Sequence, residues 1–213
     1  AIEALFQATT FVGMNTRVKP FDNPQVRQAL NYAVDKQAVI EAVWFGRGAP
    51  AAGPISPSIW GFDATLPAAY PYNPEKARAL LKAAGYPNGF ECVIWTDPRT
   101  ERKSIVEIVQ AFLAQVGVKA TIETYEWGQF LAETRKGAKG LYVLGYTGTG
   151  DADGGLFSRF HSTGIGNDNR DFWAPPEMDK LLETGRTTLD LAKRKEVYQE
   201  RELKFLGPQC RCE

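Results

Sequence analysis

Apolar and polar positions in the middle of the chain alternate in a way that predicts strands and helices in turn. Residues 90–96 (FECVIWT) are a short run rich in β-favouring side chains, and residues 100–116 place apolar side chains at helical spacing before a closing glycine. Residues 118–125 alternate between apolar and polar, as a half-buried strand does. A helical stretch over 127–135 and a strand at 141–144 complete a βαβαβ order, which favours parallel neighbouring strands.

The N-terminal part is predicted to be mostly helical. Pro24 suits the first turn of a helix that Asp22 or Asn23 caps, and the apolar stripe of this helix continues to Val43. An Asn-Pro pair at 73–74 repeats the same start signal for a shorter helix.

The segment between these helices, residues 46–71, is rich in glycine and proline. It predicts a long ordered loop across the surface, which either lines a ligand site or simply connects the helices. Two helices follow near the C-terminus, one opened by the proline pair at 175–176 and one capped by Asp190. We expect residues 1–206 to form a single α/β lobe and residues 207–213 to form a disordered tail.

The charge balance narrows the range of partners. Lys and Arg together number 25, and so do Asp and Glu, so no overall field would hold a nucleic acid. No apolar run reaches the roughly 18 residues that a membrane helix needs. The three cysteines complete no zinc pattern, and no motif implies a cofactor. We therefore expect no nucleic-acid partner, no membrane insertion, no metal and no cofactor.

Enzymatic motifs are also missing from the sequence. His161 is the only histidine, so a Ser-His-Asp set would have to use it, and Ser158 nearby lies in no nucleophile-elbow pattern. The Gly-rich stretch GTGDADGG lacks the Gly-Lys-Ser/Thr ending of a phosphate loop. The sequence therefore favours a binding module over an enzyme.

Several stretches together resemble one family. These are PFDNPQVRQALNYAVDKQAVIEAVWFGRGAPA, YPYNPEKARALLKAAGYPNG, FLAQVGVKATIETYEWGQFL, GYTGTGDADGGLF and NRDFWAPPEMDKLLETGRTTLDLAKRKEVYQE. In order and spacing they are similar to bacterial family 5 extracellular solute-binding proteins of ABC importers, the group that binds dipeptides, oligopeptides, nickel complexes and glutathione. The similarity covers about residues 10–200. The ending ERELKFLGPQCRCE departs from the family pattern.

The resemblance implies the C-terminal lobe of a periplasmic-binding-protein-like type II clamshell. Such a lobe has three layers, with a central, mostly parallel sheet flanked by helices. The implied partners are a small peptide-like ligand, a missing N-terminal lobe of the same protein and the permease subunits of an ABC importer. The implied location is periplasmic or extracellular. An exposed lobe–lobe face also suggests self-association.

Candidate ligand contacts follow from the chemistry of a zwitterion, which needs a carboxylate for its ammonium group and a guanidinium for its carboxylate. Asp151 and Asp153 follow one predicted strand, and Arg99 and Arg102 follow another; such strand ends gather ligands in open α/β sheets. The resemblance implies that an Asp of the first loop and an Arg of the second region meet the ligand. Further candidates are Thr147, Thr149, Arg170, Trp173 and Trp60.

Each of these candidates also has a purely structural interpretation. The two aspartates would stabilise their own loop, the arginines would be solvated charges at a helix start, and the tryptophans would be packing residues, a role that we assign to Trp95 and Trp127. The wording TGDADGGL is similar to the glutathione-binding branch of the family. The alternative to a ligand-binding role is an isolated interaction or structural lobe without a competent site.

Overall fold

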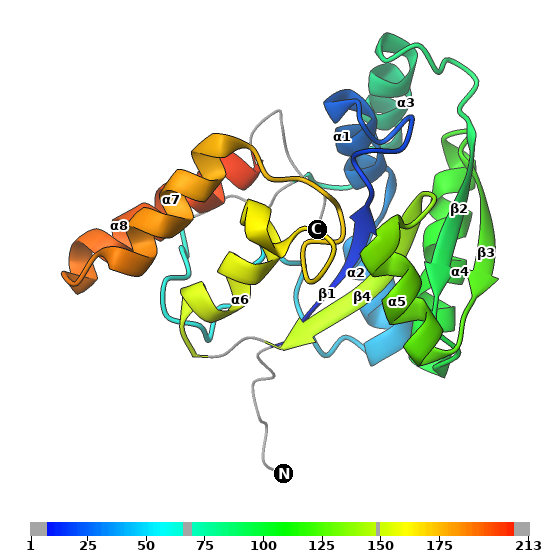
Figure 1. Ribbon diagram of the computed structural model, residues 1–213. Helices are drawn as coiled ribbons and strands as arrows, with labels where there is room; N and C mark the ends of the chain where they lie inside the picture. The colour runs from blue at the N-terminus through cyan, green and yellow to red at the C-terminus, as the bar shows by residue number, and fades with distance from the viewer. Residues whose placement is uncertain (1–7, 66–69, 148–149, 207–213) are drawn as a thin grey trace.

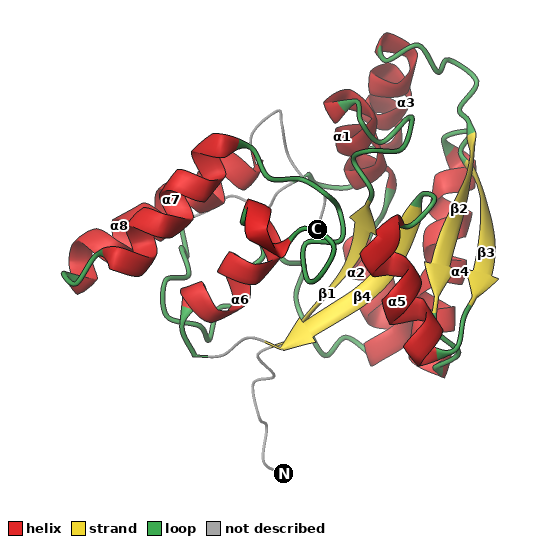
Figure 2. Cartoon of the chain, viewed as in Figure 1, coloured by secondary structure: helices red, strands yellow, loops and turns green. Residues whose placement is uncertain are grey.

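The computed structural model describes residues 8–65, 70–147 and 150–206, and the tail predicted for residues 207–213 lies outside these ranges. In chain order the elements are β1 (Ala8–Met14), α1 (Pro24–Ala33), α2 (Lys36–Trp44), α3 (Pro74–Ala83), β2 (Glu91–Thr96), α4 (Thr100–Gln115), β3 (Lys119–Thr124), α5 (Trp127–Gly137), β4 (Leu141–Thr147), α6 (Ala152–Phe160), η1 (Ser162–Gly164), α7 (Pro176–Thr187) and α8 (Leu191–Leu206). In Figures 1 and 2 the sheet and the helices α1–α5 form the right-hand part of the view, and the three helices α6–α8 form the left-hand part.

The sheet has the order β1-β4-β2-β3. β2 is parallel to both β3 and β4, as the βαβαβ pattern predicts, whereas β1 is antiparallel to β4 and closes one edge. The prediction of a mostly parallel sheet flanked by helices is confirmed. Strand β1 was not predicted, because it gains its partner from β4, more than a hundred residues later.

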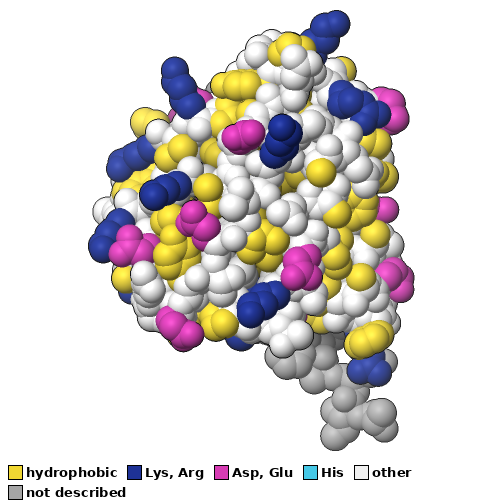
Figure 3. Space-filling view, turned by 90° about the vertical axis from the view of Figure 1, so that its right-hand side faces the viewer, with side chains coloured by type: hydrophobic (Ala, Val, Ile, Leu, Met, Phe, Trp, Pro, Cys, Tyr) yellow, Lys and Arg dark blue, Asp and Glu magenta, His cyan; other side chains and the backbone are white. Residues whose placement is uncertain are grey.

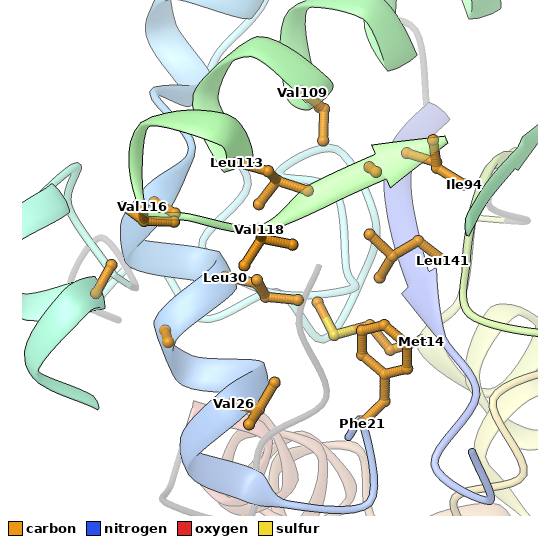
Figure 4. Packing of buried hydrophobic residues seen from close by; sticks show 14 of the residues in the cluster. Met14, Phe21, Val26, Leu30, Ile94, Val109, Leu113, Val116, Val118 and Leu141 are labelled. Atoms are coloured by element: carbon orange, nitrogen blue, oxygen red, sulfur yellow. The ribbon is translucent and has the colours of Figure 1, made fainter. Parts of the chain in front are cut away.

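Helices cover both faces of the sheet and give the three expected layers. The larger buried cluster joins α1, α3 and α4 to one face of the sheet (Figure 4). A smaller aromatic cluster, which includes Trp95, Phe130 and Tyr142, packs α5 on the other face. Because side chains alternate along β4, Leu141 and Val143 face the first cluster while Tyr142 faces the second.

The helix predicted to run on to Val43 is two helices. α1 ends at Ala33, Val34 takes an extended conformation, and the Asp35 side chain accepts a hydrogen bond from the backbone N–H of Ala38 at the start of α2. A buried apolar stripe does not distinguish one helix from two that pack on the same core. The local signal was the capping residue Asp35.

The three helices α6, α7 and α8 form a second packing unit with the loop at residues 54–62. Its buried members include Leu156, Leu182 and Tyr198, with Ile55 and Ile59 supplied by the loop. The Gly- and Pro-rich segment is therefore more than a connection, because its middle part supplies core side chains to helices that follow it by about a hundred residues.

One face of the molecule matches the balanced charge of the sequence. On the face shown in Figure 3, basic and acidic side chains are interspersed with apolar ones, and neither sign forms a large patch. Among the described residues, no helix combines the length and the apolar character needed to cross a membrane.

Candidate functional site

The end of β2 carries an ion pair between Asp97 and Arg99. The Asp97 side chain is only 1% exposed and accepts two hydrogen bonds from the Arg99 guanidinium, at 2.6 and 2.7 Å, and one from the Arg99 backbone N–H. Burial raises the pKa of the Asp97 carboxyl, but the hydrogen bonds and the charge of Arg99 outweigh it, so the net shift is downward. The Arg99 charge is thus neutralised within the lobe.

Arg102, three residues later, has no such partner. It lies in the first turn of α4 and shares a face with Ile105 and Val106, so its side chain points toward the sheet. The residue is 8% exposed, and its Nη1 atom is buried without a hydrogen bond to any part of the described chain. Burial, and then repulsion by Arg99, lowers the pKa of the Arg102 guanidinium.

Gly145 of β4 makes room for this guanidinium. It lies two residues after Val143, on the face of the sheet that α4 covers. A Cβ atom at Gly145 would lie 2.5 Å from Nη2 of Arg102, closer than real Cβ contacts come. The Arg102 side chain therefore reaches across the sheet to the carboxyl-terminal half of β4.

The start of α4 adds to the positive potential around Arg102. No side chain of the described chain caps this helix, whose N-cap residue is Arg99. The backbone N–H groups of a first helical turn carry partial positive charge, and they favour an anion next to them. The buried arginine and the uncapped helix end together favour an anion at the carboxyl ends of β2 and β4, although Glu101 in the same turn of α4 offsets part of this effect.

Of the two tryptophans that the sequence assigned to the core, only one is there. Trp95 is buried and donates a hydrogen bond from Nε1 to Glu123 at 2.9 Å. Trp127, at the start of α5, is 43% exposed, stacks on Phe130 and lies 4.6 Å from the Arg99 guanidinium carbon. The prediction for Trp127 was wrong, because helical spacing does not show which side of a first turn the neighbouring loop leaves open.

Asp151 is the N-cap of α6 and is paired within the lobe. Its carboxylate accepts a hydrogen bond from the backbone N–H of Asp153 and a bidentate pair from Arg194 of α8, at 2.7 and 3.0 Å. Burial raises the pKa of the Asp151 carboxyl, but the hydrogen bonds from Arg194 and the backbone of Asp153 outweigh it, so the net shift is downward. The loop-stabilising interpretation of this residue thus has direct geometric support.

Asp153 is held in a similar way by α7. Arg186 donates hydrogen bonds from Nε and Nη2 to its carboxylate at 2.9–3.2 Å, and the Tyr198 hydroxyl adds a weaker one at 3.3 Å. The Arg186 guanidinium carbon also lies 3.4 Å from the centre of the Phe157 ring, which in turn stacks with the ring of His161. Arg186 therefore has both an ionic partner and an aromatic contact within the lobe.

Trp60 belongs to the same group through its main chain. Its backbone N–H donates a hydrogen bond to the Gly150 carbonyl, and its carbonyl oxygen accepts one from the N–H of Ala152. These two hydrogen bonds form an isolated β-bridge between Trp60 and Asp151. The Trp60 ring packs edge-on against Tyr198 and lies 5.0 Å from the guanidinium carbon of Arg194. The long loop and the Gly-rich loop therefore lie side by side.

The remaining candidates lie in different places. Thr147 is exposed at the end of β4, and Thr149 lies outside the described residues. Arg170 is buried beside α5, where it donates to Thr134 Oγ1 and to the Asn167 carbonyl, both at 3.1 Å. Trp173 is half-buried against the α6–α8 cluster.

Arg170 lies at the opposite end of β4 from the carboxyl ends of β2 and β4. The segment that carries it contacts the end of β1 through Thr16 and Asp171, next to the start of β4. The structure thus does not bring Arg170 to the carboxyl ends of β2 and β4, where Arg102 lies.

The candidates at the carboxyl ends form two separate groups. The first, which we call the arginine group, contains Asp97, Arg99, Arg102 and Trp127; the second, the aspartate group, contains Asp151, Asp153, Arg186, Arg194, Tyr198 and Trp60. Within the described chain no hydrogen bond or ion pair joins the two groups.

Sequence reasoning missed Asp97, although its position two residues before Arg99 is typical of an Asx turn. It also missed Arg186 and Arg194, for which no local signal exists.

A sheet of this order, with its charged residues gathered beyond parallel strand ends, is the architecture of a ligand-binding lobe. The model of bacterial extracellular solute-binding proteins, family 5 (Middle), matches residues 3–167. The chain is 39% identical over 196 residues to haem-binding protein A of Haemophilus influenzae and 40% identical over 199 residues to the glutathione-binding protein GsiB of Pectobacterium atrosepticum. Each alignment covers 89% of this chain, but only 36% and 38% of the respective relative.

Solved structures agree with this assignment. The ABC-transporter-associated periplasmic binding protein DppA from Helicobacter pylori, solved with the peptide STSA, superposes with a TM-score of 0.90 at 29% identity. The match covers 96% of this chain and 41% of that one. The chain belongs to the family 5 extracellular solute-binding proteins, and it spans less than half the length of these relatives.

Proposed function

We propose that this chain is the ligand-facing lobe of the substrate-binding component of an ABC importer, and that it captures a small peptide-like ligand outside the cytoplasm for delivery to a membrane permease. The family assignment and the peptide complex of a structural relative support this role. Members of the family are solute-binding proteins, which favours binding without turnover.

The observation that carries the proposal is the state of Arg102. A buried guanidinium nitrogen without a hydrogen bond is costly, because the charge has lost water and gained no acceptor. A ligand carboxylate at this position would supply that acceptor and would also meet the uncapped start of α4. Arg99 is a weaker candidate, since its guanidinium is already paired with Asp97.

The proposed site is only half a site in this chain. A lobe whose ligand face is open to water binds charged groups weakly, because solvent screens the attraction. We therefore expect the isolated chain to bind a dipeptide with a millimolar dissociation constant, or more weakly still. The second lobe of the family architecture would exclude water and strengthen the same contacts. Self-association of the lobe stays a prediction.

The experiment is a titration of the isotope-labelled chain with Gly-Leu, followed by amide chemical shifts. Saturable shifts should gather in the first turn of α4 and the last residues of β4. Arg102→Gln should abolish them, whereas Arg99→Gln should leave most of them in place. Shifts that avoid this region, or that survive Arg102→Gln unchanged, would contradict the proposed site.

A matched pair of glycine variants tests the geometry without removing the charge. Gly145→Ala should weaken binding, because the new Cβ atom lies 2.5 Å from Arg102 Nη2 and forces the guanidinium to move. Gly128→Ala, on α5, adds a methyl group into open space and should leave binding unchanged. Equal binding by both variants and the parent chain would show that the position of Arg102 does not matter.

A further inference from the structure

The aspartate group uses its carboxylates to hold the lobe together. Asp151 and Asp153 each form a bidentate pair with an arginine of the α7–α8 hairpin, and both are further bonded by a backbone N–H or a tyrosine hydroxyl. A ligand ammonium at either carboxylate would have to compete with an arginine that is already paired with it. Arg194, for example, also donates to the Gly185 carbonyl at 2.8 Å and lies close to the rings of Trp60 and Tyr198.

Such a displacement has a poor energy balance. Charge-assisted bidentate pairs are among the stronger hydrogen-bonded contacts in proteins, and a partly buried guanidinium that loses its partner keeps the desolvation cost. The side chain of Arg194 is only 16% exposed. A ligand ammonium would exchange one cation for another and leave the displaced arginine without an acceptor.

The arginine group has the opposite character. Asp97 neutralises Arg99, while neither Nη1 of Arg102 nor the start of α4 has a side-chain hydrogen-bond partner in the described chain; Glu101, in the same turn, offsets part of the resulting positive potential. A ligand with a net negative charge gains from this potential at every distance within the Debye length, whereas a zwitterion gains only through its near end.

We propose that this lobe recognises its ligand by the carboxylate end alone, so that its ligand class includes peptide-like anions with a blocked amino group, such as N-acylated dipeptides. The inference rests on the proposed function, because it assumes that Arg102 binds the ligand. It differs from the expectation from the sequence in assigning Asp151 and Asp153 to the internal structure of the lobe.

Three ligands with the same side chains test the inference on the intact chain: Gly-Leu, N-acetyl-Gly-Leu and Gly-Leu amide. In titrations followed by amide chemical shifts, the acetylated peptide should bind at least as tightly as Gly-Leu, and up to a few-fold more tightly at low salt. Gly-Leu amide should not bind. Tighter binding of Gly-Leu than of the acetylated peptide, by about tenfold, would overturn the inference and leave the proposed function intact. Binding of the amide as tightly as Gly-Leu would overturn the proposed function itself.

Variants of the aspartate group give the second measurement. Asp151→Asn keeps a side-chain oxygen that can cap α6, while it removes the charge and exchanges one acceptor oxygen for an NH2 donor; Asp153→Asn serves as its matched partner. Neither substitution should change the ratio of the affinities for Gly-Leu and N-acetyl-Gly-Leu. A selective loss of Gly-Leu binding in either variant would show that the aspartate holds the ligand's ammonium group, which would overturn the inference.

Discussion

The sheet and the α6–α8 unit hold their parts together by different means. The sheet is stabilised by apolar clusters on its two faces, a larger one with α1–α4 (Figure 4) and a smaller aromatic one with α5. The α6–α8 unit has a smaller apolar cluster, and Arg186 and Arg194 add ion pairs that tie its hairpin to the start of α6.

This difference explains what each unit can offer a ligand. Where apolar packing provides the stability, polar side chains at the strand ends do not have to hold the fold together. Arg102 is an example, because its Nη1 atom has no hydrogen-bond partner in the described chain. In the α6–α8 unit the charged groups at the corresponding place are needed for cohesion. If the proposed function holds, residues of the same chemical type serve recognition in one unit and stability in the other.

The largest expected effect is the loss of an apolar side chain from the sheet cluster. Leu113 of α4 is 1% exposed and packs in the larger cluster. Leu113→Ala should lower the free energy of unfolding by about 2–5 kcal/mol, through lost burial and the cavity left behind. Denaturant unfolding measures this change. Leu189→Ala, at a position 95% exposed, is the control and should cost almost nothing; similar losses in both variants would contradict this account.

A smaller effect is expected where charges provide the cohesion. Asp151→Ala removes both the cap of α6 and the pair with Arg194, so the free energy of unfolding should fall by about 1–2 kcal/mol. The value stays modest because 44% of the Asp151 side chain is exposed to solvent. Asp151→Asn, which keeps the cap, should lose less. An equal loss in the two variants would show that the cap contributes little.

The smallest effect is a dependence on pH. The pKa of the Asp151 carboxyl is lowered in the folded chain, so its contribution to stability is complete above the unfolded pKa, near pH 4, and declines as the pH falls through the folded value. The difference in unfolding free energy between the parent chain and Asp151→Asn should therefore shrink on acidification from about pH 5 to pH 2. A difference that stays constant over this range would exclude the charge as its source.

Much of the fold follows from local patterns. The strands and helices from β2 to β4 have clear periodicity, and the starts of α3, α7 and α8 have proline or capping signals that the structure confirms. β1 and the break before α2 were missed for different reasons. β1 depends on a partner far away in the sequence, whereas the break carried a local signal, Asp35, that the continuous apolar stripe concealed.

The site was harder to predict than the fold. The sequence predicted that the arginines follow one strand and the aspartates another, and in the structure these strands are β2 and β4. It could not show which of Arg99 and Arg102 pairs with Asp97, because that depends on the folded positions of the two guanidinium groups. The partners of Asp151 and Asp153 lie on α8 and α7, 43 and 33 residues away. No local sequence signal shows that an arginine on a later helix will pair with an aspartate of the Gly-rich loop.

The backbone seam between Trp60 and Asp151 limits how a new specificity can be engineered at this end of the sheet. The seam consists of main-chain hydrogen bonds, so replacing the side chain of Trp60 does not by itself remove them, whereas a change in the length of either loop would shift their donors and acceptors out of register. Variation by substitution should therefore keep the two loops in register, whereas an inserted or deleted residue would shift one loop along the other and displace both.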